Sequence, residues 1–170
     1  MITLLPGRQG CAEKVPLIVT VCLALVAVFG MATSLYLFYP GALTPDSVSS
    51  LEEARSNTYG YWHPPAFAFL WRLLLTFFPA QTGMLYLSVF LYWASFAIIE
   101  ALLIGERRFV HTIFIFVVSF LPSFFIQLGE IWTDIVLSHF MLFGFALLFL
   151  AEKTNRRTLT FFSLVVIILK

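Results

Sequence analysis

Acidic side chains that could do chemistry gather in two short polar segments of an otherwise apolar chain. The segments span residues 40–63 and 129–134, and their acids are Asp46, Glu52, Glu53, Glu130 and Asp134. A carboxylate within hydrogen-bond reach of a hydroxyl group can take the proton of that group. Two carboxylates can also hold Mg²⁺ or Mn²⁺, so a divalent metal is the one cofactor that the residues suggest.

Asp46 also has an ordinary structural interpretation. Thr44 before Pro45 is a typical helix start, with a capping hydroxyl followed by proline at the first helical position. Asp46 then falls in the first turn, where free backbone N–H groups and the helix dipole favour a negative charge. It is therefore either a reactive acid or a helix-capping acid. Glu52 and Glu53 are interpreted as part of a solvated helix face.

The second segment places Glu130, Trp132 and Asp134 in a short link between two apolar runs. Trp132 suits an aromatic belt at a membrane surface, and Asp134 suits the start of the following helix. His139 comes five residues later, inside the apolar run. An ionisable residue within a membrane is a functional candidate by default, whereas Glu100 is interpreted as the anchor of a helix end.

The composition excludes a soluble domain. Hydrophobic residues make up 61% of the 170 residues and charged residues only 11%, against roughly 25% in ordinary soluble domains. The formal net charge is +1 and no basic–aromatic patch is present, so no nucleic-acid partner is expected. The two cysteines, Cys11 and Cys22, are too few for a disulfide framework or a cysteine metal site.

Several apolar runs approach the length of about 20 residues that a membrane-spanning helix needs. They cover about 15–39, 84–104, 109–128 and 135–151, with a partial run at 159–169. We therefore predict an all-α membrane protein, a polytopic helical bundle. The first run is too long for the apolar core of a cleaved signal peptide and is interpreted as a signal anchor. The partial run suggests the amino-terminal part of a longer chain.

The predicted topology depends on Pro64–Ala80. This segment is apolar but carries Arg72 near its middle, and a central arginine costs roughly 2.5–3.5 kcal/mol on membrane insertion. If the segment does not cross, the basic residues on the cytoplasmic side are Arg8, Lys14, Arg107, Arg108, Lys153, Arg156 and Arg157, as the positive-inside rule favours. We predict a helix at about 65–79 that lies at the outer interface, with Arg72 reaching the headgroups.

This topology places both acidic segments on the outer side of the membrane. The first segment belongs to an outer loop, 40–83, with predicted helices at about 45–56 and 65–79. The amino terminus is then cytoplasmic, and residues 1–170 form a single transmembrane domain in contact with the lipid bilayer.

The order of these motifs resembles the GT-C superfamily of membrane glycosyltransferases. The closest likeness is to the family-39 type, which includes protein O-mannosyltransferases and aminoarabinose transferases of lipid A. The residues that carry the resemblance are Thr44-Pro45-Asp46-Ser47, Ala54, Tyr61-Trp62-His63-Pro64-Pro65 and Glu130-Ile131-Trp132-Thr133-Asp134. The similar region covers about residues 15–151.

The resemblance implies an inverting transfer of a sugar from a polyprenyl-phosphate donor to an acceptor on the outer face, in the bacterial plasma membrane of the cell envelope. Asp46 would be the catalytic base, and Asp134 or Glu130 the second acid. Some related sequences carry a lysine that pairs with the donor phosphate at the position of Thr133. Here Arg72, or a residue beyond Lys170, would have to supply that charge. The residues that would contact the substrate are His63, Tyr61, Trp62, Trp132 and Arg72, and the aromatic ones could stack on a sugar ring.

Two other functions stay open at the level of sequence. A transporter component usually has charged or glycine-broken helices at mid-membrane, whereas the polar residues here gather in the outer loops. A non-catalytic membrane scaffold, in which every acid only caps a helix, fits the same residues.

Overall fold

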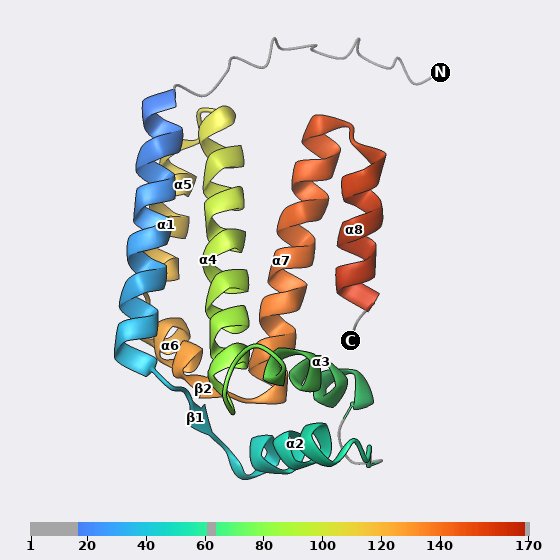
Figure 1. Ribbon diagram of the computed structural model, residues 1–170. Coiled ribbons are helices and arrows are strands. Elements are labelled where there is room, and N and C mark those ends of the chain that lie inside the picture. Colours follow the sequence, from blue (N-terminus) through green and yellow to red (C-terminus); the bar gives the residue numbers. More distant parts are fainter. Residues whose placement is uncertain (1–16, 61–63, 169–170) are drawn as a thin grey trace.

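A computed structural model describes residues 17–60 and 64–168, and most of them are helical. Figure 1 shows the order of the elements. They are α1 (Leu17–Phe38), β1 (Ala42–Leu43), α2 (Pro45–Ser56), α3 (Pro65–Leu75), α4 (Thr82–Gly105), α5 (Phe109–Ser119), α6 (Pro122–Phe125), the 3₁₀ helix η1 (Ile126–Gly129), β2 (Glu130–Ile131), α7 (Thr133–Thr154) and α8 (Arg157–Ile168).

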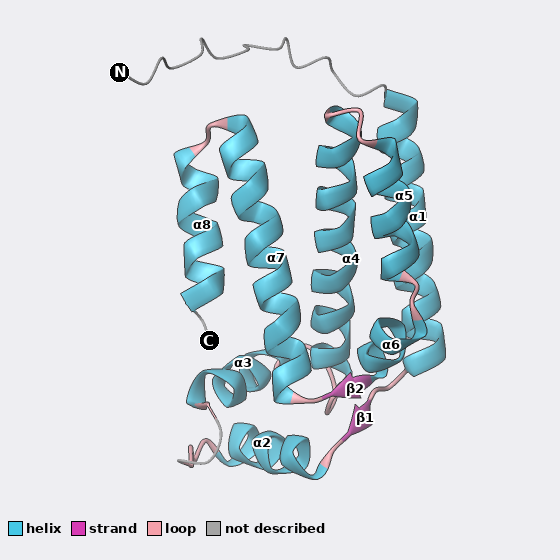
Figure 2. Cartoon of the chain, turned by 180° about the vertical axis from the view of Figure 1, so that it is seen from behind, coloured by secondary structure: helices cyan, strands magenta, loops and turns pink. Residues whose placement is uncertain are grey.

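The long helices stand side by side, and α2 and α3 lie across one end of them (Figures 1 and 2). We call this end the cap end. The opposite end, where α4 joins α5 and α7 joins α8, is called the turn end. Among the described residues, α1, α4 and α7 are long and apolar enough to cross a membrane, which indicates an integral all-α membrane protein.

Helix α4 is the central helix of the bundle. Of its most apolar stretch 44% is buried inside the protein, against 28% for α7 and 12% for α1. It packs against α1, α5 and α7, whereas much of the surface of α1 is exposed and apolar. An apolar exterior of this kind suits contact with lipid.

The apolar run at 109–128, expected as one spanning helix, is broken. Helix α5 ends at Ser119, and the next helical stretch, Pro122–Gly129, is bent by 51° from it. Proline has no N–H to continue the helix and disfavours a helical conformation in the residue before it, which explains a break at Pro122. The two parts together would make a fourth, broken span.

The two helices expected in the first loop correspond to α2 and α3. Helix α2 covers residues 45–56, and α3 covers residues 65–75 and ends four residues before the predicted boundary. In both figures α3 lies across the cap end and does not run parallel to α4. Trp71 of α3 is fully buried, and its Nε1 donates a hydrogen bond to the carbonyl of Ala80 at 3.1 Å. This bond fixes the turn between α3 and α4.

Helix α1 meets α4 where the indole ring of Trp93 lies on Gly30. A Cβ atom at Gly30 would be only 2.4 Å from Cη2 of Trp93. The indole Nε1 donates to Ser34 Oγ at 3.0 Å, and Ser34 Oγ donates to the Gly30 carbonyl at 2.8 Å. Each buried polar group in this contact therefore has a partner, as an apolar environment requires.

Two further hydrogen bonds join α4 to its other neighbours. The hydroxyl of Tyr92 donates to the carbonyl of Ser119 at the end of α5, at 2.7 Å. Ser88 Oγ and Nδ1 of the buried His139 on α7 form a hydrogen bond of 2.7 Å, and the ring of Tyr92 packs edge-on against His139. His139 is thus part of the contact between α4 and α7, five residues after Asp134. Glu100, expected to anchor a helix end, is buried in α4.

The contact between Gly30 and Trp93 predicts a loss of stability in Gly30→Ala. Alanine is more favourable than glycine inside a helix, but the added methyl group would push Trp93 off Ser34. We expect a net loss of about 1–3 kcal/mol, measured by thermal unfolding in detergent. Ala32→Val, on an exposed position of α1, is the control and should change little. A Gly30→Ala protein as stable as the control would contradict this packing.

The arrangement of the helices also predicts their sidedness. In a protein in which serine replaces Cys11 and Cys22, Ser56→Cys at the cap end and Thr154→Cys at the turn end should react with an impermeant thiol reagent from opposite faces of sealed vesicles. Both positions are exposed, and their neighbours Asn57 and Asn155 are avoided because they hold left-handed backbone conformations, with φ of 58° and 51°. Labelling of both positions from one face would refute the membrane orientation.

Candidate active site

The start of α2 follows the capping pattern of its sequence. Thr44 is the N-cap residue, and its Oγ1 accepts a hydrogen bond from the Ser47 backbone N–H at 3.3 Å. Pro45 occupies the first turn, and the helix ends at Asn57, whose left-handed conformation forms the C-cap. Asp46 therefore lies in the first turn of α2, where its side chain is exposed.

A short parallel strand pair joins the two acidic loops. Ala42 pairs with Glu130, and Leu43 pairs with Ile131 (Figure 2). The two strands come from loops that are almost 90 residues apart in the chain, as the register shows. Their pairing places both loops at the cap end of the bundle.

Two contacts next to the strands reinforce this joint. Ser47 Oγ donates a hydrogen bond to the carbonyl of Ile131, which fixes the first turn of α2 to the second loop. Gly41 adopts φ of +99°, and a Cβ atom there would be 2.6 Å from Cδ1 of Ile131. Glycine is therefore needed at Gly41 both for the backbone conformation and for the close approach of Ile131.

The joint gives Asp46 and Asp134 equivalent positions. Leu43 and Ile131 are paired, and each acid follows its paired residue by three positions, in the first turn of the helix that begins there. Both carboxylate side chains are exposed to solvent at the cap end. The structure thus brings the two predicted catalytic acids to the same end of the bundle, at the starts of α2 and α7.

Glu130 is exposed and lines a cavity of about 400 Å³. The cavity lies between the connection from α1 to β1, residues 37–42, and the segment from η1 to β2, which contributes Ile126, Gly129 and Glu130. Trp132 is also exposed, directly after β2, and its carbonyl accepts the Val136 N–H of the first turn of α7. Glu130 and Trp132 are therefore both accessible beside the strand pair.

Of the four predicted substrate-binding residues that precede the second loop, the structure describes only Arg72. Arg72 is exposed on α3, and among the described residues no ion pair joins it to Asp46, Glu130 or Asp134. Tyr61, Trp62 and His63 lie outside the described residues.

Glu53 was interpreted as a solvated residue, but its carboxylate is partly enclosed. Its Oε1 accepts a hydrogen bond from the Gly60 N–H at 3.2 Å, and its Oε2 is buried. The carboxylate thus fixes Gly60 close to the end of α2. The sequence gave no local signal for this, because Glu53 follows Asp46 by seven residues, two helical turns, and so shares a face of α2 with an exposed acid.

Among residues 17–60 and 64–168, no group of three histidine, cysteine or acidic side chains is placed to hold a metal ion. The divalent metal considered from the sequence therefore gains no support from the described geometry. What the arrangement offers is a pair of accessible first-turn carboxylates, a third acid beside a cavity and an exposed indole, all at the end of an apolar bundle.

Comparisons with known proteins find no matching family model, no matching curated protein and no matching solved structure. The class that the fold defines is an all-α integral membrane protein whose polar loops meet at one end.

The strand pair predicts that a disulfide forms between Ala42→Cys and Glu130→Cys in the cysteine-free protein. Neighbouring strands lie about 4.8 Å apart, which is within the roughly 4.4–6.8 Å between Cα atoms that a disulfide spans. Mild oxidation followed by mass spectrometry would detect the bond.

The control is Ser56→Cys with Glu130→Cys, because Ser56 lies roughly 15 Å further along α2. Cross-linking in the control pair, or its absence in the first pair, would show that the two loops do not meet as described.

Proposed function

We propose that this protein is a membrane glycosyltransferase of the GT-C type, which transfers a sugar from a polyprenyl-phosphate donor to an acceptor hydroxyl on the outer face of the membrane. The observation that carries the proposal is the joint between the two loops, because α2 and α7 start directly after the paired strands, with Asp46 and Asp134 in their first turns. The resemblance of the loop motifs to the family-39 type supports the same conclusion. The proposed location is the bacterial plasma membrane, with the amino terminus in the cytoplasm.

The proposed reaction is a single displacement. Asp46 takes the proton of the acceptor hydroxyl as the acceptor oxygen attacks the anomeric carbon of the sugar. A new bond forms between that oxygen and the anomeric carbon, and the bond from the same carbon to the phosphate oxygen breaks with its electron pair. Polyprenyl phosphate leaves, and the configuration at the anomeric carbon is inverted.

The other residues at the cap end have supporting roles in this proposal. Asp134 and Glu130 orient the hydroxyl groups of the sugar, and Trp132 offers an exposed aromatic face on which the sugar ring can stack. Arg72 on the exposed side of α3 is the candidate cation for the phosphate, since Thr133 is uncharged.

The position of the loops suits a lipid-linked donor. The exposed apolar surfaces of α1 and α5 belong in the hydrocarbon core, so the cap end lies at the boundary between membrane and water. A polyprenyl tail would remain in the bilayer while the sugar phosphate reaches the acids.

The alternatives are a transporter component and a non-catalytic scaffold. The buried Glu100 and His139 are the features that a transporter would use within the membrane. His139, however, is engaged with Ser88 in a contact between α4 and α7, which accounts for it structurally. The exposed acids at the cap end are better explained by the transferase.

The proposal predicts that Asp46→Asn lowers the transfer rate roughly 10²–10⁴-fold, the usual contribution of a general base. The measurement is the loss of labelled sugar from a polyprenyl-phosphate donor in membranes that contain the protein. Asparagine is nearly the same size, so the helix and the membrane insertion should persist.

Glu52→Gln is the matched control, because Glu52 is an exposed acid on the same helix. It should retain the wild-type rate. Equal rates for Asp46→Asn and wild type would remove Asp46 from the mechanism, and a wild-type rate no higher than that of membranes without the protein would remove the glycosyltransferase proposal itself.

A further inference from the structure

The turn end of the bundle concentrates basic residues where α4 and α7 end. Five basic and two acidic residues lie in the last turn of α7, the two connecting turns and the start of α8. They are Arg107, Arg108, Lys153, Arg156 and Arg157 with Glu106 and Glu152. This end is opposite to the acids of the cap end (Figure 1). The proposed sugar transfer makes no use of it.

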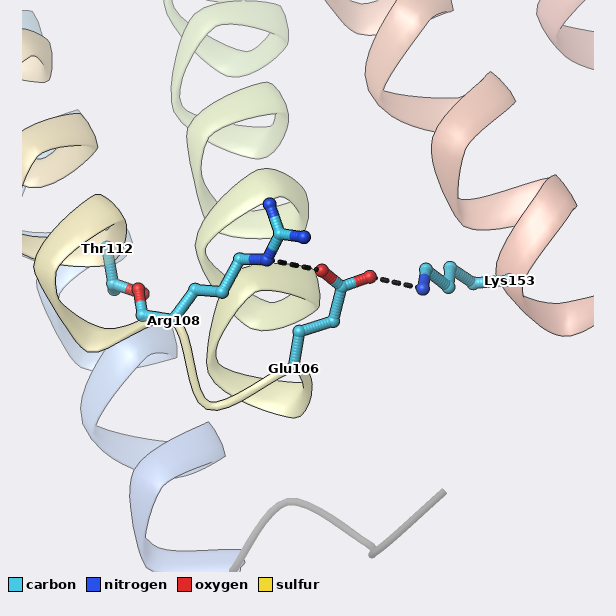
Figure 3. Close-up of polar contacts among 4 residues, drawn as sticks. All are labelled: Glu106, Arg108, Thr112 and Lys153. Atoms are coloured by element: carbon cyan, nitrogen blue, oxygen red, sulfur yellow. Dashed lines mark hydrogen bonds and ion pairs between the residues drawn. The ribbon is translucent and has the colours of Figure 1, made fainter. Parts of the chain in front are cut away.

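Glu106 arranges two of these cations. One carboxylate oxygen meets Arg108 Nε at 3.0 Å, and the other meets Lys153 Nζ (Figure 3). The hydrogen bond from Lys153 is the main reason that the pKa of Glu106 lies below its usual value, and the nearby charge of Arg108 adds to it. Arg108 comes from the turn after α4 and Lys153 from the last turn of α7, so one acid holds cations of two helices close together.

The same two cations remain open to a further partner. The side chain of Arg108 is 58% exposed and that of Lys153 is 55% exposed. An arginine that meets an acid through Nε, and a lysine with three N–H donors, both keep donors for an anion. A phosphate group is a suitable anion, because it accepts several charge-assisted hydrogen bonds at once.

An apolar cavity of about 300 Å³ lies between α4 and α7 at this end. Its apolar lining consists of Ile99, Leu102, Leu103 and Phe149. Glu106, Glu152 and Lys153 complete the lining at the ends of the two helices. Among the described residues Glu152 forms no ion pair, and its negative charge works against an anion.

We propose that this cavity binds one anionic phospholipid of the membrane leaflet at the turn end. Its acyl chain enters between α4 and α7, and its phosphate contacts Arg108 and Lys153. The cavity offers apolar walls at the depth of the acyl chains and cations at the depth of the headgroups, and this matches the two halves of a lipid. A soluble anion would use the cations alone, and an uncharged lipid would use the walls alone. Only an anionic lipid uses both.

Native mass spectrometry of the purified protein in detergent tests the proposal. With phosphatidylglycerol added, the wild type should retain one lipid, and with phosphatidylcholine it should retain markedly less. Arg108→Gln with Lys153→Gln should lower retention of phosphatidylglycerol roughly tenfold, since each basic residue near an anionic headgroup contributes to binding.

Arg156→Gln with Arg157→Gln is the matched control, because it removes the same charge from the same end but leaves the pairing of Glu106 with Arg108 and Lys153 in place. It should retain lipid nearly as well as the wild type. Leu103→Trp, which fills the cavity and leaves every charge in place, should also lose lipid. Circular dichroism tests whether each variant is folded. If Arg108→Gln with Lys153→Gln does not fold, Leu103→Trp alone tests the proposal.

The proposal is overturned if both double variants lose lipid equally, which would indicate diffuse attraction to basic charge. Equal retention of the two lipids by the wild type, or unchanged retention by Leu103→Trp, would also overturn it. Displacement of the lipid by millimolar glycerol phosphate would assign the cations to a free phosphate instead. None of these outcomes bears on sugar transfer at the cap end.

Discussion

The pairing of residues 42–43 with 130–131 is the contact on which the candidate site depends. Two residues on each side form a parallel ladder, and the hydrogen bond from Ser47 to Ile131 extends it into the first turn of α2. Such a short ladder is weak by itself, since a lone strand pair is at best marginally stable in water. It holds because its ends are fixed, by α1 on one side and by the helices α2 and α7 that begin directly after it.

The second requirement is a rigid base for that joint, and α4 supplies it. Trp93 fits against Gly30 on α1, Tyr92 reaches the end of α5, and Ser88 meets His139 on α7. Within a bilayer there is no hydrophobic force between helices, so close packing and hydrogen bonds between side chains must hold them together. These three contacts from one helix set the positions of α1, α5 and α7, and the two strands adjoin α1 and α7.

The two ends of the bundle have opposite chemistry. The cap end presents exposed carboxylates and aromatic side chains, which suit hydroxyl groups and sugar rings. The turn end presents basic side chains that Glu106 draws together over an apolar cavity, which suits an anionic headgroup and its acyl chain. In the proposed orientation, each end meets the surface of a different leaflet. A lipid held between α4 and α7 would also stabilise the helix pair from which the cap end is built.

The sequence by itself determined the class of the protein and the local structure of its loops. Apolar runs of spanning length predict the long helices, and Thr44 with Pro45 predicts the start of α2, because these signals depend only on neighbouring residues. The sequence analysis does not predict the break at Pro122, the enclosure of Glu53 or the burial of Glu100, although the proline is a local signal for the first of these. From the sequence, the two acidic loops are expected on the same side of the membrane only through the positive-inside rule. Only the tertiary structure decided that Leu43 pairs with Ile131, and that Arg72 forms no ion pair with the acids in the described part of the chain. Such pairings depend on how distant helices pack, and a pattern of neighbouring residues carries no information on that.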